Sequence, residues 1–138
     1  MAASAFADTN VLAYLVGSDP ARRATARAVF ATAPTIGTQV VNEFLNVCLR
    51  KARLERDAAH ALADELMRRC PTVAVTTDTV HAAMRIAGRY GFSHWDALIV
   101  AAAIEAGCTV LYTEDLQDGQ VLRSEERRVG KECLRLCR

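Results

Sequence analysis

The sequence lacks any apolar run near the roughly 18 to 20 residues needed to cross a bilayer. Its N-terminus also lacks the basic segment and the long apolar segment of a secretory signal. These absences lead us to expect a cytoplasmic protein. With 138 residues, 51% of them hydrophobic and 24% charged, the chain has room for one globular domain and its core.

The cysteine spacing argues against a structural zinc site. None of the five cysteines stands in a Cys-x-x-Cys pair or has histidine partners at zinc-binding spacing. Cys48, Cys70 and Cys108 lie in or beside apolar stretches. We interpret them as small buried side chains of a protein in a reducing compartment.

The charge of the chain is close to balanced, with a formal net charge of +1. From Arg123 onward, six basic residues stand against three acidic ones, which leaves 11 basic and 13 acidic residues in the rest of the chain. The body therefore carries a net charge of −2. Such a balance argues against a generic basic nucleic-acid binder.

The C-terminal segment differs from the body in another way. Residues 123–133 (RSEERRVGKEC) resemble the conceptual translation of a widely used sequencing adapter. We therefore interpret residues 123–138 as a non-native tail without function. The alternative is a native basic amphipathic tail that binds RNA or a partner.

Four carboxylates, far apart in the sequence, stand where a strand ends or a helix begins. Asp8 and Asp115 each follow a short apolar run typical of a strand, and Glu43 and Asp96 fall in the first turns of predicted helices. In an open α/β sheet these positions meet at the ligand-binding edge. Carboxylates gathered there repel one another unless a divalent cation lies among them.

Each of these positions also has a purely structural interpretation. Asp8 could be a helix N-cap, and a glutamate such as Glu43 is favoured early in a helix by the macrodipole. Asp96 could complete a capping box, and Asp115 could be a turn residue. Four such coincidences would be needed at once if every position were purely structural, so their joint occurrence favours a functional site.

Helical periodicity alternates with short strands along the chain. Predicted helices cover residues 20–33, 38–48, 56–70, 77–90 and 93–107, and predicted strands cover 5–7, 35–37, 73–75 and 110–112. We expect Thr38, Ser93 and either Thr77 or Asp78 to cap three of the helices. The alternation indicates βαβ units, hence an α/β fold with a parallel sheet.

The ordered motifs resemble the PIN domain superfamily and, within it, the VapC-type toxin ribonucleases of type II toxin–antitoxin systems. The resemblance runs from about Phe6 to Val121 and rests on the motifs at 8–10 (DTN), around Glu43, at 94–99 (HWDALI) and at 111–119 (LYTEDLQDG). It implies a PIN-like three-layer α/β/α domain over residues 1–122, with a central parallel sheet of four strands flanked by helices. The fifth, edge strand usual in the family is expected to be missing, because the tail replaces it.

The resemblance also implies a site and its partners. The catalytic and metal-binding positions are Asp8, Glu43, Asp96 and Asp115, and the neighbours of metal or substrate phosphate are Asn10, Thr113 and Asp118. Oxygen ligands without thiolate or imidazole favour Mg²⁺ or Mn²⁺. An RNA substrate, a cognate antitoxin and a homodimer follow from the same resemblance. The sequence thus predicts a metal-dependent endoribonuclease that is the toxin of a toxin–antitoxin pair.

Two other functions stay open at this point. One is a catalytically silent PIN-like module that binds RNA or a protein, which the four filled acidic positions disfavour. The other is a phosphatase of the haloacid-dehalogenase type, which also begins with an aspartate after its first strand. That chemistry needs a second aspartate two residues on, where this chain has Asn10.

Several further residues could contribute to such a site. His94 adjoins the acidic motif, but neighbouring residues on a helix point in different directions, so we leave it outside the catalytic set. We interpret Trp95 as a core or dimer anchor. The clusters Arg22-Arg23, Arg50-Lys51-Arg53 and Arg68-Arg69 would become candidate RNA contacts only if they lay beside the acidic pocket.

Overall fold

The structure, a computed structural model, describes residues 4–113 and 135–136. Its elements are β1 (Ala5–Ala7), α1 (Thr9–Ala13), the 3-10 helix η1 (Tyr14–Val16), α2 (Pro20–Ala31), β2 (Ile36–Gly37), α3 (Thr38–Arg50), α4 (Arg56–Arg69), β3 (Thr72–Val73), α5 (Thr77–Tyr90), α6 (His94–Glu105), β4 (Val110–Thr113) and β5 (Arg135–Leu136). None of the described helices is long and apolar enough to span a membrane. Asp115, Asp118 and most of the tail lie outside the described residues.

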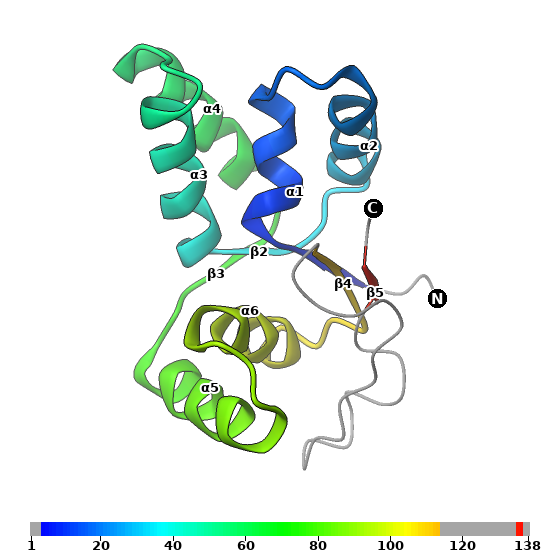
Figure 1. Ribbon diagram of the computed structural model, residues 1–138, viewed down its shortest axis with the longest axis vertical. Helices are drawn as coiled ribbons and strands as arrows, with labels where there is room; N and C mark the ends of the chain where they lie inside the picture. Colours follow the sequence, from blue (N-terminus) through cyan, green and yellow to red (C-terminus); the bar gives the residue numbers. More distant parts are fainter. Residues whose placement is uncertain (1–3, 114–134, 137–138) are drawn as a thin grey trace.

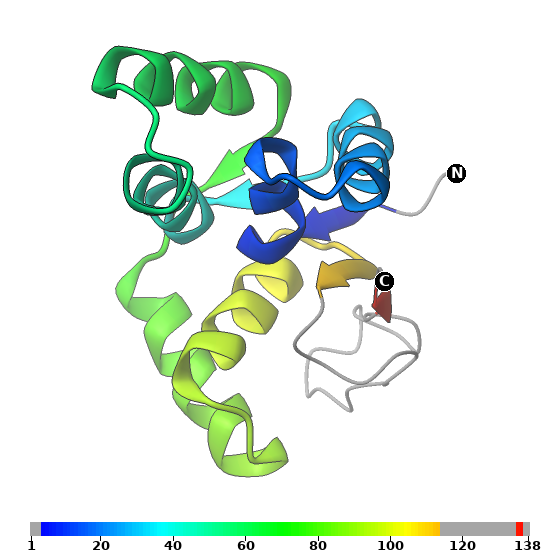
Figure 2. The same cartoon turned by 45° about the horizontal axis from the view of Figure 1, so that its top comes forward.

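The strands form a parallel sheet, as the sequence predicts. β1 pairs with β4, β4 pairs with β5, and β2 pairs with β3, all in parallel. A single parallel bridge between Phe6 and Thr35 joins the two parts, through hydrogen bonds from Ala7 N to Thr35 O (3.0 Å) and from Thr35 N to Ala5 O (2.8 Å). The spatial order is therefore β3-β2-β1-β4-β5, with β1 in the centre (Figure 2).

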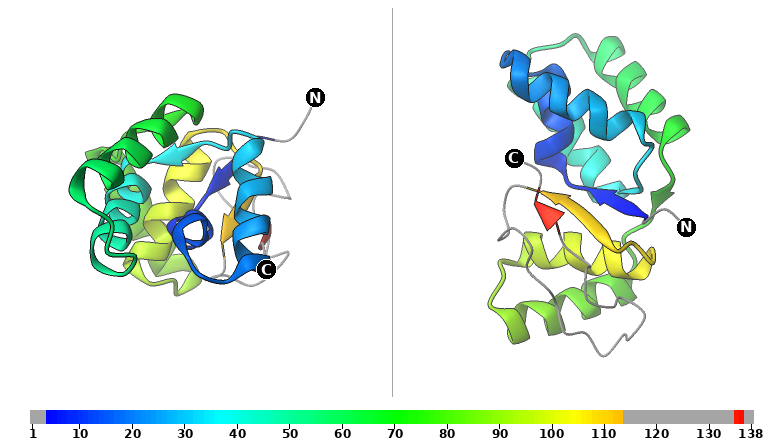
Figure 3. Two further views of the ribbon diagram at one scale, coloured as in Figure 1. Left: turned by 90° about the horizontal axis from the view of Figure 1, so that it is seen from above. Right: turned by 90° about the vertical axis from the view of Figure 1, so that its right-hand side faces the viewer.

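Helices cover both faces of this sheet. α1 to α4 lie on one side, and α5 and α6 lie on the other (Figure 1, Figure 3). Every residue of α6 from Ala97 to Ile104 is buried. A helix that is apolar all round has to be enclosed, and α6 packs against α5 beneath the sheet. The predicted three-layer α/β/α architecture is confirmed.

The edge of the sheet beyond β4 differs from the prediction. We expected four strands and no fifth, but Arg135–Leu136 forms β5, whose residues pair with Tyr112 and Thr113 of β4. An open edge strand presents unpaired N–H and C=O groups to any extended segment that can reach it. Two residues of the tail therefore occupy the place where we predicted no strand.

Two predicted helix caps are displaced, one by a contact distant in the sequence and one by a local capping box. Thr38 is the first residue of α3 instead of its N-cap, and its hydroxyl accepts a hydrogen bond from Val75 N (3.2 Å). The cap of α5 is Thr76, one residue before the predicted position, and it forms a capping box with Thr79. The predicted cap Ser93 is confirmed, because its hydroxyl accepts from Asp96 N (3.2 Å).

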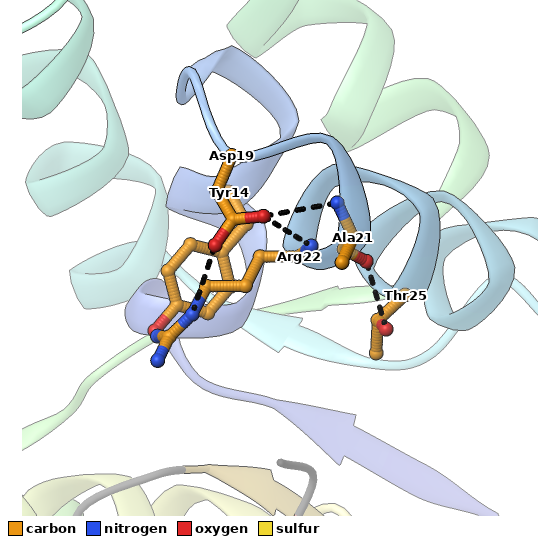
Figure 4. Close-up of polar contacts among 5 residues, drawn as sticks. All are labelled: Tyr14, Asp19, Ala21, Arg22 and Thr25. Carbon is orange, nitrogen blue, oxygen red and sulfur yellow. Dashed lines mark hydrogen bonds and ion pairs between the residues drawn. The ribbon is translucent and has the colours of Figure 1, made fainter.

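The start of α2 shows how local polar groups fix a helix away from the sheet (Figure 4). Asp19 caps α2 by accepting from Ala21 N (2.9 Å) and Arg22 N (3.3 Å). The guanidinium of Arg22 pairs with Asp19 (3.6 Å), donates to the Tyr14 hydroxyl and lies over the Tyr14 ring. The hydroxyl of Thr25 donates a hydrogen bond to Ala21 O, one turn earlier in the helix (3.2 Å). This arrangement assigns Arg22 a structural role.

The three described cysteines are free and buried, as the sequence predicts. Burial raises the pKa of the Cys48 and Cys108 thiols. Burial also raises the pKa of Cys70 from 9.0 to about 11, against a smaller opposing effect of Arg69. These side chains therefore remain neutral core groups at physiological pH.

The raised pKa of Cys70 predicts a loss of stability at high pH. Between pH 9 and about 11 the unfolded chain has released the Cys70 proton while the folded chain retains it, so the free energy of unfolding falls as pH rises. The contribution is fully present below pH 9 and amounts to about 3 kcal/mol. Urea unfolding of the wild type and of Cys70→Ala between pH 8 and 11 tests this. The variant should show the shallower decline, and equal slopes would contradict the prediction.

Candidate functional site

Asp8 stands at the point where β1 ends and α1 begins. Its backbone N–H donates to Tyr112 O of β4 (2.9 Å), and its side chain is only 5% exposed. Oδ1 accepts from Thr9 N (2.6 Å), and Oδ2 accepts from the Thr113 hydroxyl at the end of β4 (2.8 Å). Asp8 is thus an N-cap as well as a candidate site residue, and donors from two elements fix its orientation.

Glu43 is tied to Asp8 through Thr9. Glu43 lies in the second turn of α3 and is exposed, and its Oε1 accepts from the hydroxyl of the buried Thr9 (3.1 Å). Thr9 therefore donates its backbone N–H to one carboxylate and its hydroxyl to another. This pair of hydrogen bonds connects the α1 and α3 sides of the site.

A pocket of about 370 Å³ brings the predicted residues together. Its lining includes Asp8, Asn10, Glu43 and Asp96, which come from the end of β1 and from α1, α3 and α6. Asp96 is partly buried in the first turn of α6, where Ser93 holds its backbone N–H. Three of the four predicted carboxylates thus face one pocket beside the carboxyl end of the central strand.

The donor set has the chemistry that Mg²⁺ and Mn²⁺ prefer. Its side chains offer carboxylate oxygens, with no thiolate or imidazole among the lining residues. As they stand, no three acidic, histidine or cysteine side chains within residues 4–113 and 135–136 are grouped closely enough to hold a metal ion. The residues present fit a hard divalent cation in kind, and the fourth predicted ligand, Asp115, lies outside the described part of the chain.

The remaining predicted site residues divide into two groups. Thr113 is buried and contacts the site through its hydrogen bond to Asp8. Asp118, like Asp115, falls outside the described residues. His94 is exposed and is not among the residues that line the pocket, in keeping with our leaving it outside the catalytic set.

One interpretation from the sequence is wrong. Trp95 is 64% exposed and lines the pocket, so it is not a core residue. It precedes Asp96 in the first turn of α6. Its ring packs against the His94 ring in a T-shaped arrangement, with the ring centroids 5.5 Å apart. Its role in a dimer stays a prediction.

Sequence reasoning missed the polar wall that α3 adds to the pocket. Gln39, Asn42 and Asn46 line it together with Lys51, the residue that follows the last turn of α3. The signal was present, because residues 39, 42 and 46 share one helix face while the buried residues of α3 occupy another.

The position of each basic cluster relative to the acidic pocket decides whether it is a candidate RNA contact. Within the described residues, Lys51 is the member of these clusters that lines the pocket. Arg22 pairs with Asp19, and Arg68 and Arg69 pair with Glu65.

Comparison with known protein families identifies the PIN domain. The model of the PIN domain matches residues 5–117, which is most of the chain. The chain belongs to the PIN domain family. The carboxylates at 8, 43, 96 and 115 all lie within the matched residues of this PIN domain.

The solved structures that share the fold of this PIN domain include a toxin and a toxin–antitoxin complex. VapC20 of Mycobacterium tuberculosis, described as a toxin that cleaves the sarcin–ricin loop, superposes with a TM-score of 0.66 at 24% identity, over 96% of this chain and 99% of that chain. A toxin–antitoxin complex from Klebsiella pneumoniae gives a TM-score of 0.61 at 21% identity, over 80% of this chain and 85% of that chain. Comparison with curated protein sequences gives no significant match.

Proposed function

We propose that this PIN domain is a Mg²⁺- or Mn²⁺-dependent endoribonuclease and the toxin of a toxin–antitoxin pair. The observation that supports this most is the meeting of Asp8, Glu43 and Asp96, from three separate elements, in one pocket. Asp115 is the fourth proposed ligand, on the strength of its position in the family motif. Hydrolysis of an RNA phosphodiester bond needs no protein nucleophile when carboxylates hold a metal.

The residues of the pocket would have different roles in such a reaction. When bound, a divalent cation supplies charge stabilisation at the phosphorus and an activated water. Asp8, fixed by Thr9 and Thr113, and Glu43, fixed by Thr9, hold their oxygens in place before substrate arrives. These hydrogen bonds fix the orientation of Asp8 and Glu43 in the resting protein. The other proposed ligands have to approach these two carboxylates when a cation binds, because no three such side chains among the described residues are yet grouped closely enough to hold it. We propose that Asn10, Thr113 and Asp118 lie closest to the metal or the substrate phosphate.

The partners are proposed on the same basis. The structure of VapC20 is described as that of a toxin that cleaves RNA at the sarcin–ricin loop, and the Klebsiella pneumoniae structure is a complex of toxin and antitoxin. These descriptions support an RNA substrate and a cognate antitoxin for this chain. A homodimer in the cytoplasm completes the proposal.

A cleavage assay tests the reaction. The full chain is incubated with a labelled single-stranded RNA in Mg²⁺, in Mn²⁺ and in EDTA. We expect cleavage with either metal and none with EDTA. Cleavage that survives EDTA would refute the metal mechanism, whereas RNA binding without cleavage under every condition would favour the catalytically silent module.

Metal binding should also raise the melting temperature. A cation at ten times its dissociation constant stabilises the folded state by about 1.4 kcal/mol, which corresponds to about 3 to 5 °C for a chain of this size. Thermal melts with and without Mn²⁺ measure the shift. Asp96→Asn should lose it, and Asp64→Asn, which changes an exposed carboxylate of α4, should keep it. An equal shift in both variants would place the metal elsewhere.

A further inference from the structure

The indole of Trp95 is exposed at the rim of the acidic pocket. Five large hydrophobic side chains are exposed among the described residues, and Trp95, at 64%, is the most exposed of them. It is also the one of the five that lines the pocket. Leaving so large an apolar surface in water costs free energy, which a ligand that covers the ring would recover.

The α3 side of the pocket offers groups that can bind the edge of a flat heterocycle. Gln39, Asn42 and Asn46 follow one another along one face of α3, and each amide carries both an acceptor and two donors. The Oε1 atom of Gln39 is buried and has no hydrogen-bond partner among the described residues. A buried acceptor without a partner is costly to the free protein, so a rotation of this amide that brings Oε1 to the pocket, where a donor on a bound molecule can reach it, would recover that cost.

Lys51 adds a positive charge to the same wall. It follows the last turn of α3, lines the pocket and makes no ion pair with the residues that the structure describes. The carboxylates of the pocket, Glu43 of α3 among them, repel an anion unless a cation is bound. Lys51 therefore provides the pocket with a place where a phosphate of the same ligand can bind.

We propose that Trp95 and the amides of Gln39, Asn42 and Asn46 form a nucleobase subsite, with Lys51 binding the adjoining phosphate. The proposal rests on the proposed ribonuclease function. In it, the RNA base that adjoins the scissile bond binds to this wall of the pocket. The indole stacks on the base, and the amides bind its edge, as in other recognition of unpaired RNA bases. A protein partner fits less well, because the wall is mostly amide and charge with one aromatic ring.

The single tryptophan of the chain makes binding directly observable. Stacking of a base on Trp95 should quench its fluorescence. Asp8→Asn, which leaves this wall unchanged, is titrated with a short single-stranded RNA and with an abasic oligomer of the same length. We expect quenching by the RNA and little by the abasic oligomer. Equal signals from the two oligomers would overturn the proposal.

Variants in the cleavage assay provide a second measurement. Trp95→Ala should lower kcat/KM for RNA by about 5- to 150-fold, the loss that removal of one stacked base contact causes, and Trp95→Phe should recover most of it. Lys51→Ala should weaken RNA binding and lower the salt dependence of the affinity by about one ion. The control is Met84→Ala, because Met84 is 59% exposed on α5 and does not line the pocket.

The outcomes separate this proposal from the one on which it rests. Full cleavage by Trp95→Ala would overturn the base subsite while leaving the ribonuclease intact, and would leave the ring as a contact for a protein partner. Base-dependent quenching with no cleavage by the wild type in any metal would support the subsite and refute the ribonuclease.

Discussion

Asp8→Asn should lower the rate of RNA cleavage by about 100-fold or more, because it removes a charged oxygen from the most constrained position of the site. The folded structure should survive the change. An asparagine oxygen can still accept from Thr9 N, and asparagine is as good an N-cap as aspartate. Initial cleavage rates at saturating Mn²⁺, with circular dichroism as a check of folding, measure the effect.

Asp19→Asn is the matched control for this experiment. Asp19 is also the N-cap of a helix, since it accepts from Ala21 N and Arg22 N, but it does not line the pocket. The same substitution at that position should leave cleavage unchanged. His94→Ala should also retain substantial activity. If Asp8→Asn cleaved as fast as Asp19→Asn, the carboxylate would be a cap and nothing more.

Phe6→Ala should destabilise the fold by about 3 to 5 kcal/mol, the cost of removing a fully buried phenylalanine ring. Phe6 is 0% exposed and lies in β1, the central strand. Its Cζ atom would lie 3.4 Å from a Cβ built on Gly37, so the ring fills the space left by the absent side chain. Domains are stable by only about 5 to 15 kcal/mol, so the loss is a large share of the total.

Urea unfolding followed by circular dichroism measures this loss. Trp95→Ala is the aromatic control, because its ring is 64% exposed and its removal should change the free energy of unfolding by no more than about 0.5 kcal/mol. If the two variants lost similar amounts of unfolding free energy, the burial of the Phe6 ring would not explain the effect of its removal. A loss below about 1 kcal/mol in Phe6→Ala would contradict the central position of β1.

The parts of the fold that local sequence dictates could be predicted. The short apolar run before Asp8 is a strand that stops at a carboxylate, because the chain there turns into a helix capped by that same side chain. Gly91 ends α5 with a φ of 74°, a conformation that glycine adopts without steric cost. In each case the deciding interactions lie within a few residues along the chain.

The parts that depend on distant contacts could not be predicted. Thr38 is a residue type that often caps helices, but its hydroxyl instead accepts a hydrogen bond from Val75 N, 37 residues away. Trp95 has the size of a core residue, yet its burial depends on which elements pack over the start of α6. The helical spacing of apolar residues in α3 identifies its buried face and its polar face, but it does not indicate which other elements of the fold enclose a pocket beside that polar face.

The hydrogen bond between Thr113 and Asp8 joins residues that are 105 positions apart. β1 gains its neighbour β4 only when residues 110–113 are available, so a nascent chain on the ribosome holds Asp8 without the partner that orients it. Because domains fold as their chain emerges during synthesis, the site assembles late, after most of the body has left the ribosome. For the ribonuclease that we propose, such timing would keep an unfinished copy inactive beside the message that encodes it.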